Sequence, residues 1–370
     1  MSRTLAILGT RGVPAQHGGF ETFAEYLSLF LVSKGWDVTV YCQEDCAGGV
    51  VKEDVWCGVR RVFIPVSRSG ASGTIEFDWK SVLHTIRSRH RLVLTLGYNT
   101  AAFCLPYRFF GIQNVINMDG IEWMRDKWKP HERAWLWLNE RIGCLVGNHL
   151  VADHPQIQVH LETRVSARKI TMIPYGARPA EAADAGLLKS YGLEPGRFIS
   201  VIARPEPENS VLEIVQAFSR KRRGFKLVML GNYSPEKNDF HRTVLHAASD
   251  EVVFPGAIYE KATVDAIRVF SRVYVHGHRV GGTNPSLIEA LGSKSAVLAH
   301  DNRFNRWVVG DGARYFSDVE SCEVQLESLL SNDDVVDAMK KASWERFCKD
   351  FTWDIVLEQY ERLLSRWAAA

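Results

Sequence analysis

Short apolar runs alternate with amphipathic stretches through the first half of the chain. Thr4–Leu8 is a compact apolar run ended by Gly9, which predicts a buried strand. Residues 20–34 carry apolar side chains at spacings of three and four and are followed by Gly35, which predicts a helix with one apolar stripe. Further strands are predicted at residues 38–41, 62–65, 92–96, 115–118 and 149–152. Because strands that alternate with helices are joined by right-handed crossovers, this pattern indicates a parallel sheet with helices on both faces.

The second half repeats the same alternation. Strands are predicted at residues 198–203, 226–231, 252–254, 273–275 and 296–299, and helices at 211–220, 237–248, 262–270 and 285–291. Between the halves, residues 174–195 are rich in Ala, Gly and Pro with little strand pattern, so we place the linker there. We therefore expect an α/β chain with two doubly wound domains, residues 1–175 and 176–350. Residues 351–370 are expected to form a separate C-terminal helix, because aromatic and apolar residues recur there at helical spacing from Trp353 to Trp367.

The composition is that of an ordinary globular protein. The chain has 370 residues, more than one core usually serves, of which 46% are hydrophobic and 24% charged. A formal net charge of +2 gives no support for bulk electrostatic binding to nucleic acid. The 7 cysteines are scattered without CxxC pairs, which argues against a disulfide framework or a zinc cage. No apolar run reaches the ~18–20 residues of a membrane span, and no signal peptide is evident, so we expect a cytoplasmic protein.

The loop of residues 9–21 follows the first predicted strand and precedes the first predicted helix. In tandem doubly wound domains, ligands bind at the carboxyl ends of strands, in the crevice where the sheets face each other. Glycines let the backbone approach an anion, and a helix N-terminus offers free N–H groups. The candidate ligand residues of this loop are Arg11, His17, Gly18 and Gly19. The spacing matches neither GxGxxG nor a P-loop, and the alternative is a long, merely permissive turn.

Two further loops carry charged residues directly after predicted strands. Asp119 and Glu122 are placed to orient a hydroxyl or accept its proton, although Asp also suits a capped turn that opens a helix. Arg204 stands at a strand end, where a guanidinium matches the oxygens of a diphosphate bidentately. The alternative for Arg204 is an ion pair with Glu206 or Glu208.

The loop of residues 276–289 is the strongest phosphate-site candidate. Asn284 is a natural N-cap and Pro285 a natural first helical residue, so a helix begins directly after a glycine pair. Glu289 lies in the second turn, where it is able to reach a sugar hydroxyl; the alternative is a structural carboxylate with a partner in the protein. This loop also holds two alternate histidines, His276 and His278. No third metal ligand stands at a recognisable spacing from them, so no metal is expected.

A family resemblance is carried by three segments, GTRGVPAQHGGFETFAEYL, NMDGIEW and HGHRVGGTNPSLIEALGSKSAVLAHDNRFNRWVVGDGARYF. They resemble the bacterial GT-B glycosyltransferases of family 4, and most of all the subgroup with β-1,4-rhamnosyltransferases of capsule and cell-wall polysaccharide synthesis. The resemblance covers nearly the whole chain. It implies two Rossmann-like domains facing a central cleft, with a C-terminal helix that crosses back to the first domain. It also implies a nucleotide-sugar donor bound mainly by the second domain and an acceptor bound mainly by the first.

The resemblance implies roles for individual residues. Gly18 and Gly19 match the loop at the donor diphosphate and transferred sugar, and Arg204 matches the basic residue on the distal phosphate. By role, the implied catalytic residues are Arg204, Asp119 and Gly19, the acceptor-side residues Asp119, Glu122 and His17, and the donor-binding residues Gly18, Gly19, Arg11, Arg204, Asn209, Ile258, Tyr259, Gly282, Thr283, Asn284 and Glu289. Two positions depart from the family pattern: Gly281 replaces the first glutamate of E-x7-E, and Asn209 replaces a lysine. Arg279 or Arg11 is the expected substitute cation.

The implied activity is that of a retaining, metal-independent hexosyltransferase without a cofactor. The expected partners are a nucleotide diphosphate sugar, with dTDP-rhamnose as the subgroup donor, and a lipid-linked saccharide acceptor. The alternatives are a sugar-nucleotide epimerase of GT-B fold and a donor-binding, non-catalytic partner in a glycan assembly complex. A dehydrogenase is disfavoured because neither half shows GxGxxG with an acidic residue downstream.

A membrane-surface contact is a further hypothesis. Aromatic and basic residues stand together at Trp128, Lys129, Trp135 and Trp137. This mixture suits an anionic lipid surface, which would place the protein peripherally on the inner face of the cytoplasmic membrane. The alternative is that the tryptophans pack into the first domain.

Overall fold

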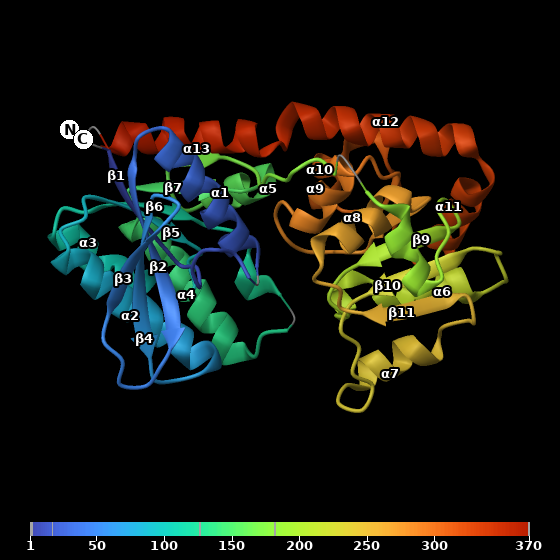
Figure 1. Cartoon of the computed structure of the whole chain (residues 1–370), viewed down its shortest axis with the longest axis horizontal. Helices are drawn as coiled ribbons and strands as arrows, with labels where there is room; N and C mark the ends of the chain where they lie inside the picture. Colours follow the sequence, from blue (N-terminus) through green and yellow to red (C-terminus); the bar gives the residue numbers. More distant parts are fainter. Residues whose placement is uncertain (1–2, 17, 126, 181–182, 369–370) are drawn as a thin grey trace. The chain divides into compact units, whose positions relative to one another are not determined.

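The computed structural model describes residues 3–16, 18–125, 127–180 and 183–368. The chain forms two compact units, the first made of Met1–Tyr175 with Trp353–Ala370 and the second of Gly176–Thr352. Both are α/β folds built on mainly parallel sheets (Figure 1). The predicted class, two Rossmann-like units with a helical C-terminus, is confirmed. No helix in the described ranges is both long and apolar enough to cross a membrane.

The sheet of the first unit has the strand order β3-β4-β2-β1-β5-β6-β7-β8 over the described residues. Its strands are β1 (Thr4–Leu8), β2 (Asp37–Asp45), β3 (Lys52–Trp56), β4 (Val59–Val66), β5 (Leu92–Leu96), β6 (Gln113–Asn117), β7 (His149–Ala152) and β8 (Ile170–Met172). Neighbouring strands are parallel except β3 and β4, an antiparallel pair at one edge. The helices are α1 (Gly19–Ser33), α2 (Gly70–Arg87), α3 (Leu105–Phe109), α4 (Pro130–Val146), α5 (Pro155–Glu162) and α13 (Trp353–Ala368).

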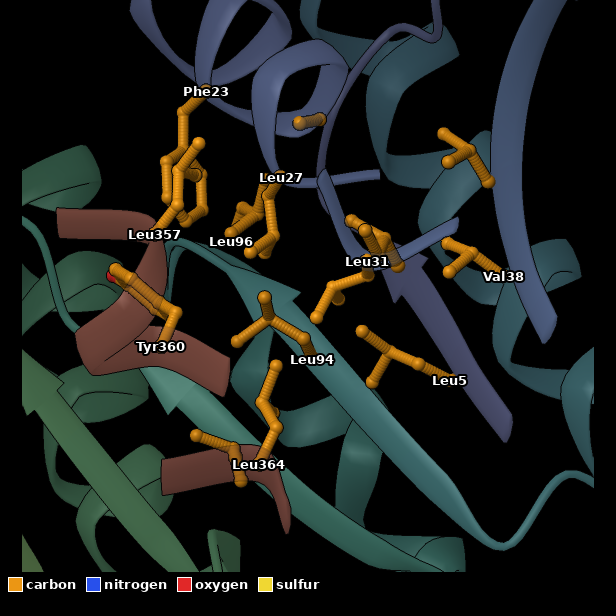
Figure 2. Close-up of a cluster of buried hydrophobic side chains, with 14 of the residues drawn as sticks. Leu5, Phe23, Leu27, Leu31, Val38, Leu94, Leu96, Leu357, Tyr360 and Leu364 are labelled. Atoms are coloured by element: carbon orange, nitrogen blue, oxygen red, sulfur yellow. The ribbon is translucent and has the colours of Figure 1, made fainter. Parts of the chain in front are cut away.

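The last helix of the chain completes the core of the first unit. Figure 2 shows Phe23 and Leu27 of α1 converging with Tyr360 and Leu364 of α13 near Leu94 of β5. The rings of Phe23 and Tyr360 lie with their centroids 4.7 Å apart. The apolar and aromatic stripe predicted for the C-terminal helix is therefore its buried face.

The second unit has the strand order β11-β10-β9-β12-β13-β14 over the described residues, and each neighbouring pair is parallel. Its strands are β9 (Phe198–Ile202), β10 (Lys226–Leu230), β11 (Val252–Gly256), β12 (Val273–His276), β13 (Val297–His300) and β14 (Arg314–Phe316). Its helices are α6 (Val211–Ser219), α7 (Asp239–His246), α8 (Lys261–Phe270), α9 (Pro285–Gly292), α10 (Arg303–Val309), α11 (Val319–Ser331) and α12 (Asp333–Asp350). This order is that of the doubly wound nucleotide-binding fold.

The structure departs from the sequence interpretation in two places. The pattern predicts neither β3 nor the short strands β8 and β14; β3 is exposed along most of its length, so it carries no apolar signal. The predicted linker 174–195 is wrong in its second half. Residues Ala185–Tyr191 form a 3-10 helix there, and Leu188 and Leu193 are buried in the core of the second unit.

Candidate functional site

The strand order of each sheet reverses at one point, between β1 and β5 in the first unit and between β9 and β12 in the second. In open α/β sheets, ligands bind beyond the carboxyl ends of the strands at such a switch point. Predicted site residues stand on the loop after β1, on the loop after β9 and on the loop after β12.

A cavity of about 1030 Å³ opens at the switch point of the first unit. Its lining includes Arg11, Gly18 and Gly19 from the loop after β1 and Gly97 from the loop after β5. The structure thus brings three of the predicted ligand residues onto one cavity. The guanidinium of Arg11 is exposed and makes no ion pair with any described residue. His17 lies outside the described residues.

Two of the tryptophans predicted at a membrane surface line the same cavity. They are Trp128 and Trp135, and the indole of Trp135 donates to the carbonyl oxygen of Asn99 at 2.9 Å. Trp137 is a surface residue outside the cavity lining, and the guanidinium of Arg141 lies 3.4 Å from its ring centroid. Trp128 and Trp135 therefore line the cavity, but Trp135 is also 41% exposed, as is Trp137 at 42% outside the lining.

Asp119 follows β6 in a left-handed turn with a φ of 48°. Its backbone N–H donates to Oδ1 of Asn117 at 2.9 Å, and Nδ2 of Asn117 donates to the hydroxyl of Tyr360 on α13, also at 2.9 Å. Burial, together with the carboxylates of Asp153 and Glu122, raises the pKa of Asp119 to about 7. A carboxyl group with this pKa is partly ionised at neutral pH and is suited to exchange a proton with a ligand.

Glu122 is engaged by neighbouring groups. Its carboxylate accepts from Nη1 of Arg125 at 2.9 Å and from Nε1 of Trp128 at 3.2 Å, and it lies 3.7 Å from Nζ of Lys127. Burial by itself raises the pKa of Glu122, but the charges of Arg125 and Lys127 outweigh it and lower the pKa. Glu122 is therefore ionised, and it links the turn after β6 to a tryptophan of the cavity wall.

Asp153 is a site residue that the sequence interpretation missed. It is buried directly after β7, and its charge contributes to the raised pKa of Asp119. The sequence pattern that predicts Asp119 as a site residue also applies to Asp153, because both are acidic residues at the carboxyl end of a strand in a parallel sheet. The two residues thus follow the carboxyl ends of the neighbouring parallel strands β6 and β7.

In the second unit, Arg204 stands exposed on the loop after β9 and makes no ion pair with any described residue. The alternative pairing with Glu206 or Glu208 is not observed there. The carbonyl oxygen of Arg204 accepts from Nδ2 of Asn209 at 2.9 Å. Asn209 is buried, so its side chain shapes this loop from within while the guanidinium of Arg204 stays open to a ligand.

The loop after β12 packs closely against the loop after β9. A Cβ on Gly277 would lie 2.1 Å from the carbonyl oxygen of Asn209, so this approach requires glycine. Arg279 donates through Nε to the hydroxyl of Ser210 at 2.9 Å and forms an ion pair with Glu213. The guanidinium of Arg279 is thus engaged within the unit, which leaves Arg204 as the open cation of these two loops among the described residues.

Helix α9 begins at Pro285, as predicted. Oδ1 of Asn284 accepts from the backbone N–H of Ser286 at 3.0 Å, which confirms the N-cap. The hydroxyl of Ser286 donates to the carbonyl oxygen of Ile202 at 3.3 Å and so ties the first turn of α9 to the end of β9. Gly282 and Thr283 directly precede this helix start. The positive end of the α9 dipole and the Arg204 loop therefore lie at the same switch point.

Three other predicted donor contacts have distinct surroundings. Glu289 on α9 forms an ion pair with the buried Arg268 of α8 through its Oε2. The side chain of Glu289 nevertheless stays partly exposed. On the loop after β11, Ile258 packs against the core of the unit and Tyr259 is exposed. An exposed ring beside a packed aliphatic side chain is a suitable surface for a nucleobase.

His276 and His278 stack with ring centroids 4.3 Å apart. Burial, together with His278 and His300, lowers the pKa of His276 well below its usual range, so its ring is neutral. Over the described residues, no group of three or more His, Cys, Asp or Glu side chains is arranged to hold a metal ion.

The whole chain has the GT-B fold of the glycosyltransferases. It is similar to sucrose-phosphate synthase from Thermosynechococcus elongatus, with a TM-score of 0.83, 16% identity and 100% of both chains covered. It is also similar to Alr3699/HepE from Anabaena in complex with UDP and glucose, with a TM-score of 0.75, 10% identity and coverage of 99% of this chain and 100% of that one. The catalytic domain of starch synthase IV from Arabidopsis thaliana, bound to ADP and acarbose, gives a TM-score of 0.74 at 14% identity, with 100% of both chains covered.

At the level of sequence, residues 2–178 match the family described as "Domain of unknown function (DUF1972)". No curated protein matches the chain. The match lies within the first unit and the first residues of the second, whereas the structural similarity spans both units.

Proposed function

We propose that the chain is a glycosyltransferase that moves a sugar from a nucleotide diphosphate donor to a hydroxyl of a lipid-linked saccharide. The second unit binds the donor, the first binds the acceptor, and the donor suggested by family resemblance is dTDP-rhamnose, used in surface polysaccharide synthesis. The observation that carries the proposal is the exposed guanidinium of Arg204, which has no ion pair among the described residues and stands two positions after Ile202, the residue bonded to the first turn of α9. Proteins of the same fold bind matching ligands, namely UDP and glucose in one and ADP and acarbose in another.

The reaction breaks the bond between the anomeric carbon and the diphosphate oxygen and forms a bond from that carbon to the acceptor oxygen. The bonding electrons leave with the diphosphate, so negative charge grows on it as the bond lengthens. Arg204, the backbone amides of Gly282 and Thr283 and the dipole of α9 stabilise this charge. The acceptor attacks from the leaving-group face, which retains the configuration, and its proton passes to the departing phosphate. In this metal-independent scheme, Arg11 is the unpaired candidate for an additional cation, because Arg279 is engaged by Glu213.

Asp119 orients the acceptor hydroxyl in this scheme. Ionised, it accepts a hydrogen bond from that hydroxyl and directs an oxygen lone pair at the anomeric carbon. Because burial and Asp153 raise its pKa to about 7, the ionised fraction changes across neutral pH. Transfer is therefore expected to rise with pH through this range.

A peripheral membrane contact completes the proposal, because a lipid-linked acceptor resides at a membrane. Lys129, Trp135 and Trp137 are exposed at and near the start of α4. On and directly after α3, Phe109 is 82% exposed and Phe110 64%. Large apolar side chains next to basic ones suit the interface of an anionic bilayer on the cytoplasmic side.

The proposal is tested by nucleotide binding followed by transfer. Thermal stabilisation is measured with dTDP, UDP and GDP, because a ligand at a hundred times its Kd adds about 2.7 kcal/mol to the free energy of unfolding. The preferred nucleotide then identifies the class of sugar donor to offer with a lipid-linked saccharide. If calorimetry finds no association with any nucleoside diphosphate or its glycosylated form, the assignment is wrong. Epimerised donor formed without an acceptor would instead identify a sugar-nucleotide epimerase.

A further inference from the structure

A second cavity, of about 320 Å³, adjoins the large cavity of the first unit. Arg11, Glu21 and Gln43 line both cavities and so form part of the wall between them. They come from three elements, the loop after β1, the first turn of α1 and β2. The backbone N–H of Gln43 donates to the carbonyl oxygen of Arg11 at 3.0 Å, which fixes two of these elements to each other.

One carboxylate oxygen of Glu21, Oε2, is buried in this wall without a hydrogen-bond partner among the described residues. Glu21 is 8% exposed, and its Oε2 has no hydrogen-bond partner among the described residues. The same oxygen lies 3.0 Å from the position that a Cβ would take on Gly18, so the glycine leaves room for it. Its place in the first turn of α1 gives it only the favourable end of the helix dipole. An unsatisfied buried carboxylate destabilises a fold, so its presence in a cavity wall calls for a ligand.

Gln43 presents a second unsatisfied acceptor to the same wall. Its Nε2 donates to Oδ1 of Asp45 at 2.9 Å. Because a carboxylate only accepts hydrogen bonds, the amide nitrogen must face Asp45, and Oε1 is left buried without a partner. Two such acceptors in one wall suit a ligand with more than one O–H or N–H donor.

Arg11 gives the wall a donor of opposite charge. It shares both cavities with Glu21, yet no ion pair joins the two side chains. Hydroxyl groups suit the acceptors Glu21 and Gln43, and a ring or phosphate oxygen suits the guanidinium of Arg11. A pyranose ring offers this combination of groups.

We propose that Arg11, Glu21 and Gln43 form a sugar subsite of the first unit, in which Glu21 and Gln43 accept hydrogen bonds from ring hydroxyls. This inference deepens the proposed function and rests on it for the reaction, but not for the binding of a sugar. The ring belongs either to the acceptor or to the donor, and the chemistry of recognition is the same for both.

The experiment compares Glu21→Gln with the wild-type chain, and Glu53→Gln serves as the control because Glu53 is an exposed glutamate on β3. Calorimetry is performed with dTDP, dTDP-rhamnose, UDP, UDP-glucose, methyl α-L-rhamnopyranoside and methyl β-D-glucopyranoside. If the subsite holds the donor ring, Glu21→Gln should lower the affinity for one nucleotide sugar by about tenfold and leave the affinity for its nucleotide unchanged. If the subsite holds the acceptor ring, Glu21→Gln should lower the affinity for one methyl glycoside by the same factor and leave the affinities for the nucleotide sugars unchanged. If every affinity is the same in Glu21→Gln and wild type, as for a wall that binds only water, the inference is wrong.

Thermal unfolding of the ligand-free protein separates a binding role from a structural one. Glu21→Gln keeps the shape of the side chain and replaces a carboxylate whose Oε2 is buried without a partner by a neutral amide, so the melting temperature of the ligand-free protein should rise. A lower melting temperature, or failure to fold, would overturn the inference. Binding of dTDP or UDP by the wild-type chain tests the proposed function separately, because these nucleotides lack the transferred sugar.

Discussion

The hydroxyl of Tyr360 accepts a hydrogen bond from the side-chain amide of Asn117 at 2.9 Å, although the two residues are 243 positions apart in the chain. Oδ1 of the same Asn117 accepts from the backbone of Asp119. The C-terminal helix therefore supports the turn of Asp119 through two successive hydrogen bonds. This support is needed because a φ of 48° is uncommon for a residue with a Cβ.

Tyr360→Phe should lower both stability and turnover. The substitution leaves the amide of Asn117 buried without its acceptor, which costs about 1–3 kcal/mol in the free energy of unfolding. The turn of Asp119 loses its anchor, so kcat should fall while the KM for the donor stays unchanged. Tyr315→Phe is the matched control, because that hydroxyl donates to Gly310 within the second unit, far in sequence from Asp119. Wild-type kcat in Tyr360→Phe, measured per folded molecule, would remove Tyr360 from the positioning of Asp119.

Arg204→Ala should lower turnover by roughly 10²–10³-fold, the range for loss of one group that stabilises a charged transition state. The melting temperature should change little, because Arg204 is exposed and has no ion pair among the described residues. Arg222→Ala is the control, since Arg222 is an exposed arginine of the same unit whose ion pair with Asp250 is also exposed. Steady-state transfer kinetics and thermal unfolding test the two expectations. A near-normal rate in Arg204→Ala would show that another group stabilises the leaving phosphate.

Asp119→Asn should make stability less dependent on pH. Burial and Asp153 raise the pKa of Asp119 to about 7 from its usual 3.8, so protonation favours the folded state. The stabilisation that the proton gives is complete below pH 3.8 and is lost as the pH rises through 7. Asparagine stays neutral and tolerates the left-handed turn. The free energy of unfolding of Asp119→Asn should therefore exceed that of the wild type by about 1 kcal/mol or more at pH 8 and equal it near pH 4.

Urea unfolding at several pH values measures this difference, and the transfer rate supplies a second readout. The wild-type rate should rise through pH 7, whereas Asp119→Asn should be slow and flat. Glu53→Gln removes an exposed carboxyl group and should retain the wild-type profiles. Parallel stability curves for Asp119→Asn and wild type would show that Asp119 titrates in its ordinary range.

The double substitution Phe109→Ser with Phe110→Ser should weaken binding to vesicles of phosphatidylglycerol. Both rings are largely exposed and follow Arg108, so they are placed to enter the lipid interface. Co-sedimentation at low salt measures the effect, and raised salt should weaken wild-type binding further. Val324→Ser, at a valine that is 63% exposed on α11 of the second unit, should bind as wild type does. Absence of wild-type binding to anionic vesicles would exclude the proposed membrane contact.

Local chemistry explains what the sequence could reveal. The central strands are apolar runs, of which β1, β5, β10 and β12 are each followed directly by a glycine, and Asn284 followed by Pro285 starts a helix by short-range geometry alone. These features depend on neighbours within a few positions, so a pattern along the chain is sufficient to predict them. The placement of Arg204, Gly282 and Thr283 at one switch point follows from the order of strands and helices.

Partners from distant segments explain what the sequence could not reveal. No local pattern shows that Arg279 is engaged by Glu213, that Glu289 pairs with Arg268, or that Asp153 lies beside Asp119. Each of these contacts decides whether a charged side chain is open, engaged or shifted in pKa. The buried Oε2 of Glu21 is of the same kind, because only the folded structure shows that no described residue hydrogen-bonds to it.

The first unit is assembled from both ends of the chain, whereas the second is one continuous stretch, Gly176–Thr352. During translation the second unit has all its residues before the first one does, since α13 follows residue 352 in the chain. Until then Phe23 of α1 lacks its aromatic neighbours Trp353 and Tyr360, and Asn117 beside the turn of Asp119 lacks its bond to Tyr360. A product truncated before residue 353 should therefore have a less stable first unit and lack the proposed transfer activity.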